Sequence, residues 1–408
     1  MKIGVLGIGI TKFGERWDQG LRDLLLDSQL RALNDSKIDS KQIDAMYTGN
    51  MIGGIASGQL HVGAMATENL NLNIPSVRVE GACASGSIAL RQGIHAIESG
   101  SADIVMVNGV EKMTDVSTEQ ITTALMGAGD EELEGFNGLT FPGLYALLAN
   151  SYMKEYGLIR EVLAEVSVKN HYHGARNSYA QFQNEITIDT VMNATMVADP
   201  LTLFDCSPIT DGAASIIIAN EKVAKKMNSE VYITASGLAT DTLSLARRES
   251  LLELKAGRLA AESAYKQAGI TAKDVNFAEV HDCFSIAEIY AVEALGLAKR
   301  GEAAQLYTSK QTYFDGKHPV NTSGGLKACG HPVAATGIKQ AVEAVTQLRG
   351  AGEKRQVPNA EIGVTYNVGG SGATACVHVF KKMRWLKWLY LRMWKYGWNI
   401  RRSKRNVW

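Results

Sequence analysis

The sequence predicts an α/β fold in which helices cover a mixed sheet, built from two similar halves. Short apolar runs of strand length alternate with longer segments that carry apolar residues at helical spacing. Two stretches of the first half recur in the same order in the second half. A long segment of mixed character interrupts the first half, and we expect it to form an insertion on the shared core.

Strands and helices are expected in a repeating order along the chain. Residues 3–10 and 104–107 are apolar runs of strand length, and residues 21–33 carry apolar side chains at helical spacing. A second helix is expected at Ser85–Glu98. Further buried strands are expected at residues 46–48, 216–219, 278–280, 362–366 and 373–380. This order favours helical layers on a mixed sheet.

The internal repeat consists of two pairs of segments. Residues 38–50 (IDSKQIDAMYTGN) align without gaps with residues 270–282 (ITAKDVNFAEVHD), and each is expected to end in a strand. Residues 102–109 (ADIVMVNG) are similar to residues 360–370 (AEIGVTYNVGG). Because both pairs occur in the same order, the sequence predicts two similar structural units.

These patterns divide the chain into two halves, an insert and a tail. The halves are expected at about residues 1–225 and 230–380, and the insert at about residues 113–203. An insert of this size on a compact core is typical of a lid or a binding subdomain. The tail, residues 381–408, differs in composition from everything before it.

The tail is basic and rich in tryptophan. It contains ten Lys and Arg, no acidic residue and five of the chain's six tryptophans, so that the first 380 residues have a net charge of −10. This composition suits a membrane surface, an acidic partner or nucleic acid. A peripheral helix packed on the core, or an extension foreign to the fold, is the simpler interpretation.

Composition excludes several classes of protein. The net charge of zero gives no signature of nucleic-acid binding, and none is expected for the core. The five cysteines are odd in number and form no CxxC pair, which argues against a disulfide framework or a structural zinc site. The first residues indicate a strand instead of a signal peptide, and no apolar run approaches the roughly 18 residues of a membrane-spanning helix. A cytoplasmic protein is expected.

Cys83 is the first candidate for a nucleophile. It lies in GACASGS, residues 81–87, between a strand-like segment and a helix that is expected to begin near Ser85. The helix dipole and nearby amides at such a turn favour the thiolate form. The backbone N–H of Cys83 would also help to bind an oxyanion. A buried structural cysteine among small residues is the alternative interpretation.

A second candidate group is HDCFS, residues 281–285. In extended chain His281 and Cys283 share one face, so a donor and a base would point into the same cavity. The alternative is a helix start, with Asp282 as the N-cap of the following helix. The two roles are compatible.

His331 is the third candidate, in NTSGGLKACGHPVAATG, residues 321–337. The glycines permit tight turns, and a histidine on a rigid turn is a plausible general base for a cysteine nucleophile. A hydrogen-bonded loop histidine is the alternative. Two further histidines, His171 and His173, point to different faces of a predicted helix, and we expect them to be structural.

Together these segments resemble the thiolase superfamily over residues 1 to about 380. The GHP motif among its glycines is specific, and HDCF narrows the resemblance to archaeal-type and sterol-carrier-protein-linked thiolases. Residues 205–215 (DCSPITDGAAS) resemble the strand and turn that close the N-terminal half in that family, and residues 366–375 (YNVGGSGATA) are similar to its glycine-rich C-terminal loop. Biosynthetic thiolases carry NEAF in place of HDCF, and a second cysteine in the glycine-rich loop. This chain has Asn367 there, and Cys283 would replace that cysteine.

The resemblance implies the thiolase fold: five-layered αβαβα from two similar βαβαβ halves, with a lid insertion, as a homodimer or homotetramer. It also implies that Cys83 is acylated and that Cys283 removes a proton from the α-carbon of a second acyl-CoA. His331 would help to deprotonate Cys83 and, with a water or donor held by His281, would stabilise the enolate oxygen. Backbone N–H groups of Cys83 and Gly369 would hold the tetrahedral oxyanion.

The substrates implied by the resemblance are coenzyme A thioesters, with two acetyl-CoA giving acetoacetyl-CoA and CoA in a reversible reaction. No metal or redox cofactor is required, and the sequence does not identify the residues that bind CoA. By resemblance to archaeal enzymes of mevalonate synthesis, a complex with hydroxymethylglutaryl-CoA synthase, bridged by a small OB-fold and zinc-ribbon protein, is a possible partnership.

Three alternatives remain open from the residues. A ketoacyl-synthase-like enzyme would also use a Cys-His-His set, but a decarboxylating enzyme makes its carbanion without the base that Cys283 supplies. A CoA-free C-acyltransferase is a related option. A non-catalytic thiolase-like scaffold or a retro-aldolase relative would be indicated by loss of the first cysteine, and Cys83 is present.

Overall fold

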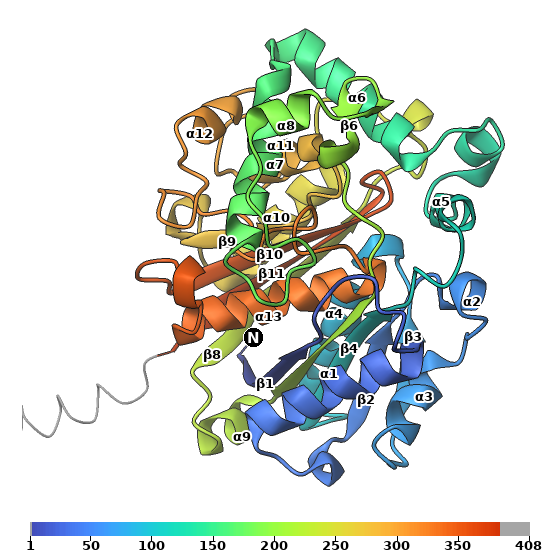
Figure 1. The fold of residues 1–408 in the computed structure, drawn as a ribbon. Helices are drawn as coiled ribbons and strands as arrows, with labels where there is room; N and C mark the ends of the chain where they lie inside the picture. The colour runs from blue at the N-terminus through green and yellow to red at the C-terminus, as the bar shows by residue number, and fades with distance from the viewer. Residues whose placement is uncertain (1, 384–408) are drawn as a thin grey trace, which may run out of the picture.

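The fold is centred on one large mixed sheet with helices on both faces (Figure 1). A computed structural model describes residues 2–383. The sheet has nine strands in the order β3-β2-β4-β7-β1-β8-β11-β10-β9. The strands are β1 (Ile3–Ile10), β2 (Ala45–Gly49), β3 (Ser76–Val79), β4 (Ile104–Glu111), β7 (Gly212–Ala219), β8 (Val231–Thr240), β9 (Phe277–Val280), β10 (Ile362–Gly369) and β11 (Thr374–Lys382).

The sheet consists of two halves with the same topology. In the first half β2 pairs with β4 in parallel, and β4–β7 and β7–β1 are antiparallel. In the second half β9 pairs with β10 in parallel, and β10–β11 and β11–β8 are antiparallel. The halves join through two residue pairs of β1 and β8, Ile3 with Ile233 and Gly4 with Tyr232.

The repeat seen in the sequence corresponds to these matching strands. The first pair of similar segments contains β2 and β9, and the second contains β4 and β10. The counterpart of β3 in the second half is reduced to a single parallel bridge between Ala278 and Val320. The prediction of two similar halves is therefore confirmed, while the exact boundary between residues 225 and 230 stays a prediction.

Helices add three layers to the two halves of the sheet. On the outside of the first half lie α1 (Leu21–Ser36) and α3 (Val62–Glu68), which contact β1 and β3 respectively. α4 (Ser85–Glu98) and α13 (Thr336–Arg349) pack on each other between the halves, with α4 on β4 and α13 on both β10 and β7. On the outside of the second half α10 (Lys255–Ala268) covers β8 and β11. The predicted five-layered αβαβα fold is confirmed.

The central position of α13 explains its composition. Twelve of its fourteen residues are buried, and they include Lys339, Gln340, Glu343 and Gln347. Because a helix between two sheets has no solvent face, its polar side chains must find partners inside the protein. These partners belong to the loops that surround the candidate site, as described below.

The insert occupies the chain between β4 and β7 and covers the second half. α6 (Phe141–Tyr156) and α7 (Arg160–Gly174) pack on α11 (Ser285–Ala294), and α12 (Ala304–Thr308) packs on α7. Figure 1 shows α6, α7 and α8 gathered over α11, on the side of β9 and β10. The remaining helices and short strands are α2 (Gly53–Ala56), α5 (Thr118–Met126), α8 (Ile188–Met192), α9 (Glu221–Lys226), β5 (Met196–Ala198) and β6 (Leu201–Thr202).

The last strand differs from the prediction. β11 ends at Lys382, two residues beyond the expected end at residue 380, because Lys381 and Lys382 continue the pairing with β8. The backbone N–H of Met383 then donates to the Glu230 carbonyl at 2.8 Å. The rest of the basic tail lies outside the described residues. Within residues 2–383, none of the helices has the length and apolar character needed to cross a membrane.

Candidate active site

A small, mostly apolar cavity lies where the two halves and the insert meet. It has a volume of about 170 Å³ and contains Cys83, Cys283 and His331 in its lining. The insert contributes Ile121, Leu125, Phe141 and Tyr145 to its wall. Two larger clefts, of about 400 and 610 Å³, are lined by charged side chains and contain none of the four predicted catalytic side chains.

Cys83 lies on a tight turn between β3 and α4. The turn is a 3-10 helix, η2 (Ala82–Ala84), and it begins with Ala82 at a φ of +52°, a conformation that is unfavourable for a residue with a Cβ. The Ser85 hydroxyl donates to the Ala82 carbonyl at 2.5 Å and accepts the Gly81 N–H at 3.0 Å. These two bonds fix the turn that presents the sulfur to the cavity.

The surroundings of Cys83 keep its thiol neutral at rest. Burial raises its pKa to about 12, although the backbone N–H groups of Gly370 and of Cys83 itself lower it. The prediction of thiolate character from the helix dipole is therefore wrong for the resting protein, because desolvation outweighs it. The same two N–H groups point at the sulfur, where an oxyanion on an attached acyl group would develop. The predicted donor Gly369 is the neighbour of Gly370.

His331 is held with one nitrogen free to accept a proton. Its Nδ1 lies 2.7 Å from the Thr336 Oγ1, and that hydroxyl donates its single proton to the Pro332 carbonyl at 3.2 Å. We assign the ring proton to Nδ1 on this bonding pattern, which leaves a lone pair on Nε2. Burial, together with the nearby His281 and Lys339, holds the pKa of His331 well below its usual value. His331 is therefore a neutral acceptor.

His281 has the opposite tautomer. Its Nδ1 accepts from the Asn367 Nδ2 at 3.0 Å, so the ring proton is on Nε2. This Nε2 is buried and has no hydrogen-bond partner in the described structure. Burial, and to a smaller degree the Lys339 charge, lowers the pKa of His281 to about 3. A neutral histidine with an unpaired N–H can donate a hydrogen bond to a ligand that enters the cavity.

The four predicted catalytic side chains come together from three separate segments. The rings of His281 and His331 are 5.0 Å apart at their centroids and almost perpendicular, at 84°. One ligand atom each of Cys83, His281 and His331 lies within 4.8 Å of the others. Cys283 lines the same cavity, and burial raises the pKa of its thiol while a hydrogen bond with Tyr145 lowers it.

Within residues 2–383, Cys83, His281 and His331 are also close enough to one another to hold a metal ion. A thiophilic cation such as Zn²⁺ accepts these ligand types. The Nε2 of His281 carries a proton in the tautomer assigned from the Asn367 contact, and the Cys83 thiol is neutral, so both would have to lose protons first. The arrangement therefore fits proton transfer and anion binding better than metal coordination.

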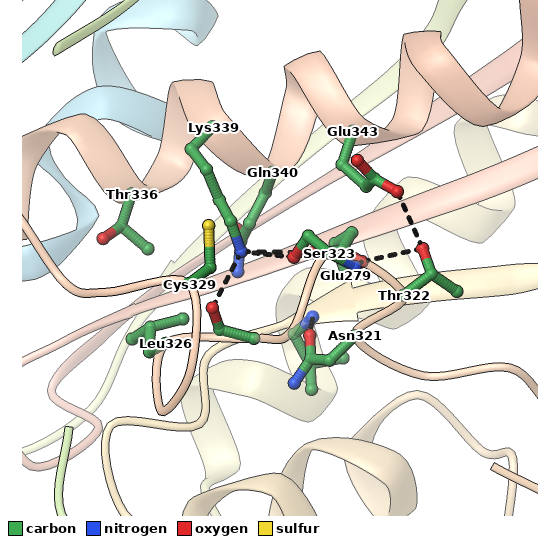
Figure 2. A network of polar contacts seen from close by, with 12 residues as sticks. Glu279, Asn321, Thr322, Ser323, Leu326, Cys329, Thr336, Lys339, Gln340 and Glu343 are labelled. Carbon is green, nitrogen blue, oxygen red and sulfur yellow. Dashed lines mark hydrogen bonds and ion pairs between the residues drawn. The ribbon is translucent and has the colours of Figure 1, made fainter. Parts of the chain in front are cut away.

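A buried ionic network, drawn in Figure 2, is centred on Lys339, whose charge helps to lower the pKa of both histidines. Lys339 of α13 donates to the Ser323 Oγ at 2.5 Å and to the Gly325 carbonyl at 3.1 Å, and it lies 3.4 Å from a Glu279 oxygen of β9. Figure 2 shows the same chain of contacts continuing from Glu279 through Thr322 to Glu343. The network anchors the loop that contains Ser323 and Gly325 to β9, the strand that precedes His281.

A second network connects the halves at the other side of the cavity. Glu111, at the end of β4, accepts from the Asn50 Nδ2 at 2.6 Å and from the backbone N–H groups of Met51, Ile52 and Ala334 at 2.9 to 3.2 Å. Ala334 belongs to the 3-10 turn η7 (Val333–Ala335) that leads from His331 into α13. The carboxylate thus fixes the position of His331 relative to the first half.

Comparison with known proteins identifies the family. Residues 4–222 match the family of the thiolase N-terminal domain, and residues 237–382 match the thiolase C-terminal domain-like family. The chain belongs to the thiolase family. The predicted superfamily and fold are thereby confirmed.

Two archaeal relatives are similar over nearly their whole length. An acetyl-CoA acetyltransferase of Methanothermobacter thermautotrophicus is 49% identical over 382 residues, which cover 93% of this chain and 99% of the relative. One of Methanocaldococcus jannaschii is 45% identical and covers 94% and 99%. The human sterol carrier protein 2 is 33% identical over 91% of this chain and 70% of its own length. An Ltp2-ChsH2(DUF35) aldolase has the same fold, with a TM-score of 0.82, 21% identity and coverage of 95% and 99%.

Several residues of this thiolase site were not predicted. Thr336, which fixes the tautomer of His331, follows it by five positions among small residues and gave no signal other than its hydroxyl. Asn367 was noted as the replacement of a cysteine, but not as the partner of His281. Tyr145 and Glu111 lie far from the motifs in sequence, and nothing in their local sequence indicates that they reach the site.

Two predicted structural interpretations have different outcomes. Asp282 does not cap the helix after HDCF, because α11 begins at Ser285 with Phe284 as its N-cap. Asp282 instead accepts from the Leu326 N–H and from the Asn170 Nδ2, each at 2.7 Å. His171 and His173 bond backbone carbonyls of neighbouring loops, at 3.2 and 2.9 Å, which agrees with a structural role.

Proposed function

We propose that this thiolase is an acyl-CoA C-acyltransferase that condenses two acetyl-CoA to acetoacetyl-CoA and CoA, reversibly, through an acyl-cysteine intermediate. The observation that carries the proposal is the complementary state of the two histidines beside Cys83. His331 offers a lone pair, and His281 offers an unpaired N–H. One suits removal of a proton from the nucleophile, and the other suits binding of a developing anion. The names of the archaeal relatives support acetyl-CoA as the substrate.

In the first half-reaction Cys83 attacks the thioester carbonyl. Its proton passes to the free Nε2 of His331, since a neutral thiol with a pKa of about 12 must lose its proton during the attack. Backbone N–H groups of Cys83 and of the glycine-rich loop, Gly369 or Gly370, bind the oxyanion. The departing CoA thiolate takes the proton of Cys283. The acyl-enzyme then holds a Cys283 thiolate and a protonated His331.

In the second half-reaction a second acetyl-CoA enters. The Cys283 thiolate removes a proton from its α-carbon, and the N–H of His281 binds the enolate oxygen. The enolate carbon attacks the acyl group on Cys83, and the carbon–sulfur bond breaks. His331 returns its proton to the Cys83 thiolate, so that all groups regain their starting state. No metal or redox cofactor is required by this sequence of steps.

The size of the cavity favours a short acyl group. The cavity measures about 170 Å³, and Met113, Ile121, Leu125, Phe141 and Phe284 close it on the apolar side. An acetyl or acetoacetyl group fits a space of this size, and a long fatty acyl chain would need the insert to move. We therefore expect activity to fall steeply with acyl chain length.

The second cysteine separates this proposal from the alternatives. A ketoacyl-synthase-like enzyme, which makes its carbanion by losing CO₂, has no use for a base at position 283. A CoA-free C-acyltransferase would share the acylation of Cys83 but not the exchange of α-protons of acetyl-CoA. A scaffold protein or an aldolase relative would form no acyl-enzyme at all.

Assembly, location and pathway stay predictions. We propose a homodimer or homotetramer in the cytoplasm, acting at the entry to mevalonate synthesis. A complex with hydroxymethylglutaryl-CoA synthase through a bridging OB-fold and zinc-ribbon protein is part of the same proposal. One structural neighbour, the Ltp2-ChsH2(DUF35) aldolase, has this fold and is associated with a DUF35 protein.

The test is a trapping experiment with the intact protein. Incubation with acetyl-CoA should add one acetyl group to Cys83, detected by intact-protein and peptide mass spectrometry. Acetoacetyl-CoA and CoA should then be converted to two acetyl-CoA. Absence of both the adduct and the thiolysis would exclude the thiolase activity proposed for this site.

A further inference from the structure

Tyr145 of the insert lies beside both cysteines of the proposed reaction. It is fully buried on α6, and it lines the cavity together with Cys83, Cys283 and Gly370. Its ring stacks on that of Phe284, with centroids 4.6 Å apart and an angle of 27°. Because Phe284 follows Cys283 directly, this stacking fixes the tyrosine relative to the second cysteine.

The Tyr145 hydroxyl has one proton and two acceptors within reach. It donates to the Gly370 carbonyl at 3.0 Å, and it shares the cavity wall with the Cys283 thiol, whose pKa it lowers. A phenol can donate to the carbonyl while its oxygen accepts from a neutral S–H. If the cysteine loses its proton, the sulfur becomes the stronger acceptor, since hydrogen bonds to an ionised group are the stronger ones.

We propose that Tyr145 is a positioning residue that stabilises the thiolate of Cys283 between the two half-reactions, by turning its O–H from the Gly370 carbonyl to the sulfur. The inference rests on the proposed function. Only the hydroxyl rotates, and no bond to carbon, sulfur or oxygen is formed or broken. The proton that Cys283 has lost is on the departed CoA, and the thiolate regains a proton from the α-carbon of the second acetyl-CoA.

The other groups around Cys283 do not supply this hydrogen bond. Burial is the main reason why its pKa is raised, and the nearby Cys83 and Asp282 raise it further. The Lys327 charge lowers it, but the Lys327 Nζ donates to the Asp205 carbonyl. A buried thiolate in an apolar wall is costly without a donor, and the Tyr145 hydroxyl is a donor in the same cavity wall.

The experiment compares Tyr145→Phe with a matched tyrosine. Tyr145→Phe keeps the ring and its stacking on Phe284, and it removes only the hydroxyl. Tyr290→Phe is the control, because Tyr290 is equally buried and its hydroxyl donates to the Leu251 carbonyl at 2.6 Å, outside the catalytic cavity. Three readouts are measured: acetylation of Cys83, exchange of the α-protons of acetyl-CoA in deuterated water, and the pH dependence of Cys283 alkylation by iodoacetamide in the Cys83→Ala background.

In Tyr145→Phe we expect exchange to fall about 10- to 100-fold, the range for one hydrogen bond to a charged group. Acetylation should fall less than threefold, and alkylation of Cys283 should move to higher pH. Tyr290→Phe should leave all three within twofold. Equal losses of acetylation and exchange would show that the hydroxyl acts through the Gly370 loop, and would overturn the inference. An unchanged rate of exchange would also overturn it. If the wild type forms no acyl-enzyme, the proposed function fails, while an unchanged alkylation profile separately refutes the Tyr145 contact.

Discussion

The two halves of the molecule carry different chemistry at the same topological positions. In each half a 3-10 turn leads into the central helix: η2 precedes α4, and η7 precedes α13. Cys83 lies within the first turn, and His331 lies two residues before the second. Because α4 and α13 pack on each other, and η2 contacts η7, the symmetry of the fold brings nucleophile and base to one cavity.

The strand ends differ in whether their polar groups are satisfied. Glu111 ends β4 in the first half, and both of its oxygens accept hydrogen bonds. In the second half Gly369 ends β10 at the equivalent position, and the loop beyond it directs the Gly370 N–H toward Cys83. His281, after β9, has an unpaired Nε2. Satisfied groups hold the halves together, and unsatisfied ones mark where a ligand binds.

The largest expected effect is on the nucleophile of the first half. Cys83→Ala should lower thiolysis of acetoacetyl-CoA by at least about 10⁴-fold, since removal of a covalent nucleophile leaves only binding and oxyanion stabilisation. Thermal unfolding should change little, because only a sulfur is removed. Cys329→Ala is the control, since Cys329 is buried outside the catalytic cavity. Full activity of Cys83→Ala would show that the first half does not supply the nucleophile.

The second cysteine should be essential for only one of the two half-reactions. Cys283→Ala should still acetylate Cys83 at a rate within tenfold of the wild type, while exchange of the α-protons of acetyl-CoA falls about 10³-fold or more. The reason is that the second step needs the Cys283 thiolate as its base, whereas in the first step Cys283 only gives a proton to the departing CoA thiolate, which water can also protonate. Mass spectrometry of the acyl-enzyme and NMR of the exchanged acetyl-CoA measure the two steps. Normal exchange in this variant would show that another group is the base.

The hydroxyl of Thr336 should have a smaller but separable effect on the base. Thr336→Val removes the acceptor of the His331 Nδ1–H with little change in shape, so the ring loses its fixed tautomer. We expect kcat to fall about 10- to 100-fold with KM nearly unchanged. Thr336→Ser retains the hydroxyl and should recover most of the activity. Equal losses in both variants would point to packing instead of the tautomer.

The sequence predicted most of the fold and the identity of the four central side chains. The spacing of the apolar residues and the similarity of the β2 and β9 segments are enough to predict two similar halves, because strand pairing follows from them. The direction of the pKa of Cys83 was predicted incorrectly, since a sequence does not show how far a thiol is desolvated. Tyr145 was missed because it reaches Cys283 and Gly370 across more than a hundred residues of chain.

The junction between the halves should depend on pH through Glu111. Burial raises the pKa of this carboxyl to about 7, above the ordinary value of 4.5 that applies in the unfolded chain. The protonated form is thus favoured by folding, and this contribution to stability is present at low pH and is lost as the pH rises through about 7, by up to about 3 kcal/mol.

Glu111→Gln tests this dependence. The variant places an amide NH₂ against backbone N–H donors, so it should be less stable by about 1–3 kcal/mol. Its stability should also decline less than that of the wild type between pH 5.5 and 8. Unfolding by urea at both pH values measures the difference. Parallel pH curves for the two proteins would show that Glu111 keeps the same charge in the folded and unfolded states.

The smallest expected effect concerns the tail beyond the two halves. The last strand ends at Lys382, and Met383, the last residue that the structure describes, donates its N–H to Glu230 and packs against the outer layer of the first half. The cavity and all groups of the proposed mechanism lie within residues 83–370. Truncation after Met383 removes eight basic and no acidic residues, so it should lower the pI. We expect thiolysis within twofold of the full chain and an unchanged melting temperature.

A matched truncation after Val379 should unfold the protein, since it removes three residues of β11 that pair with β8. Loss of activity already at Met383 would mean that the two halves alone do not make the enzyme.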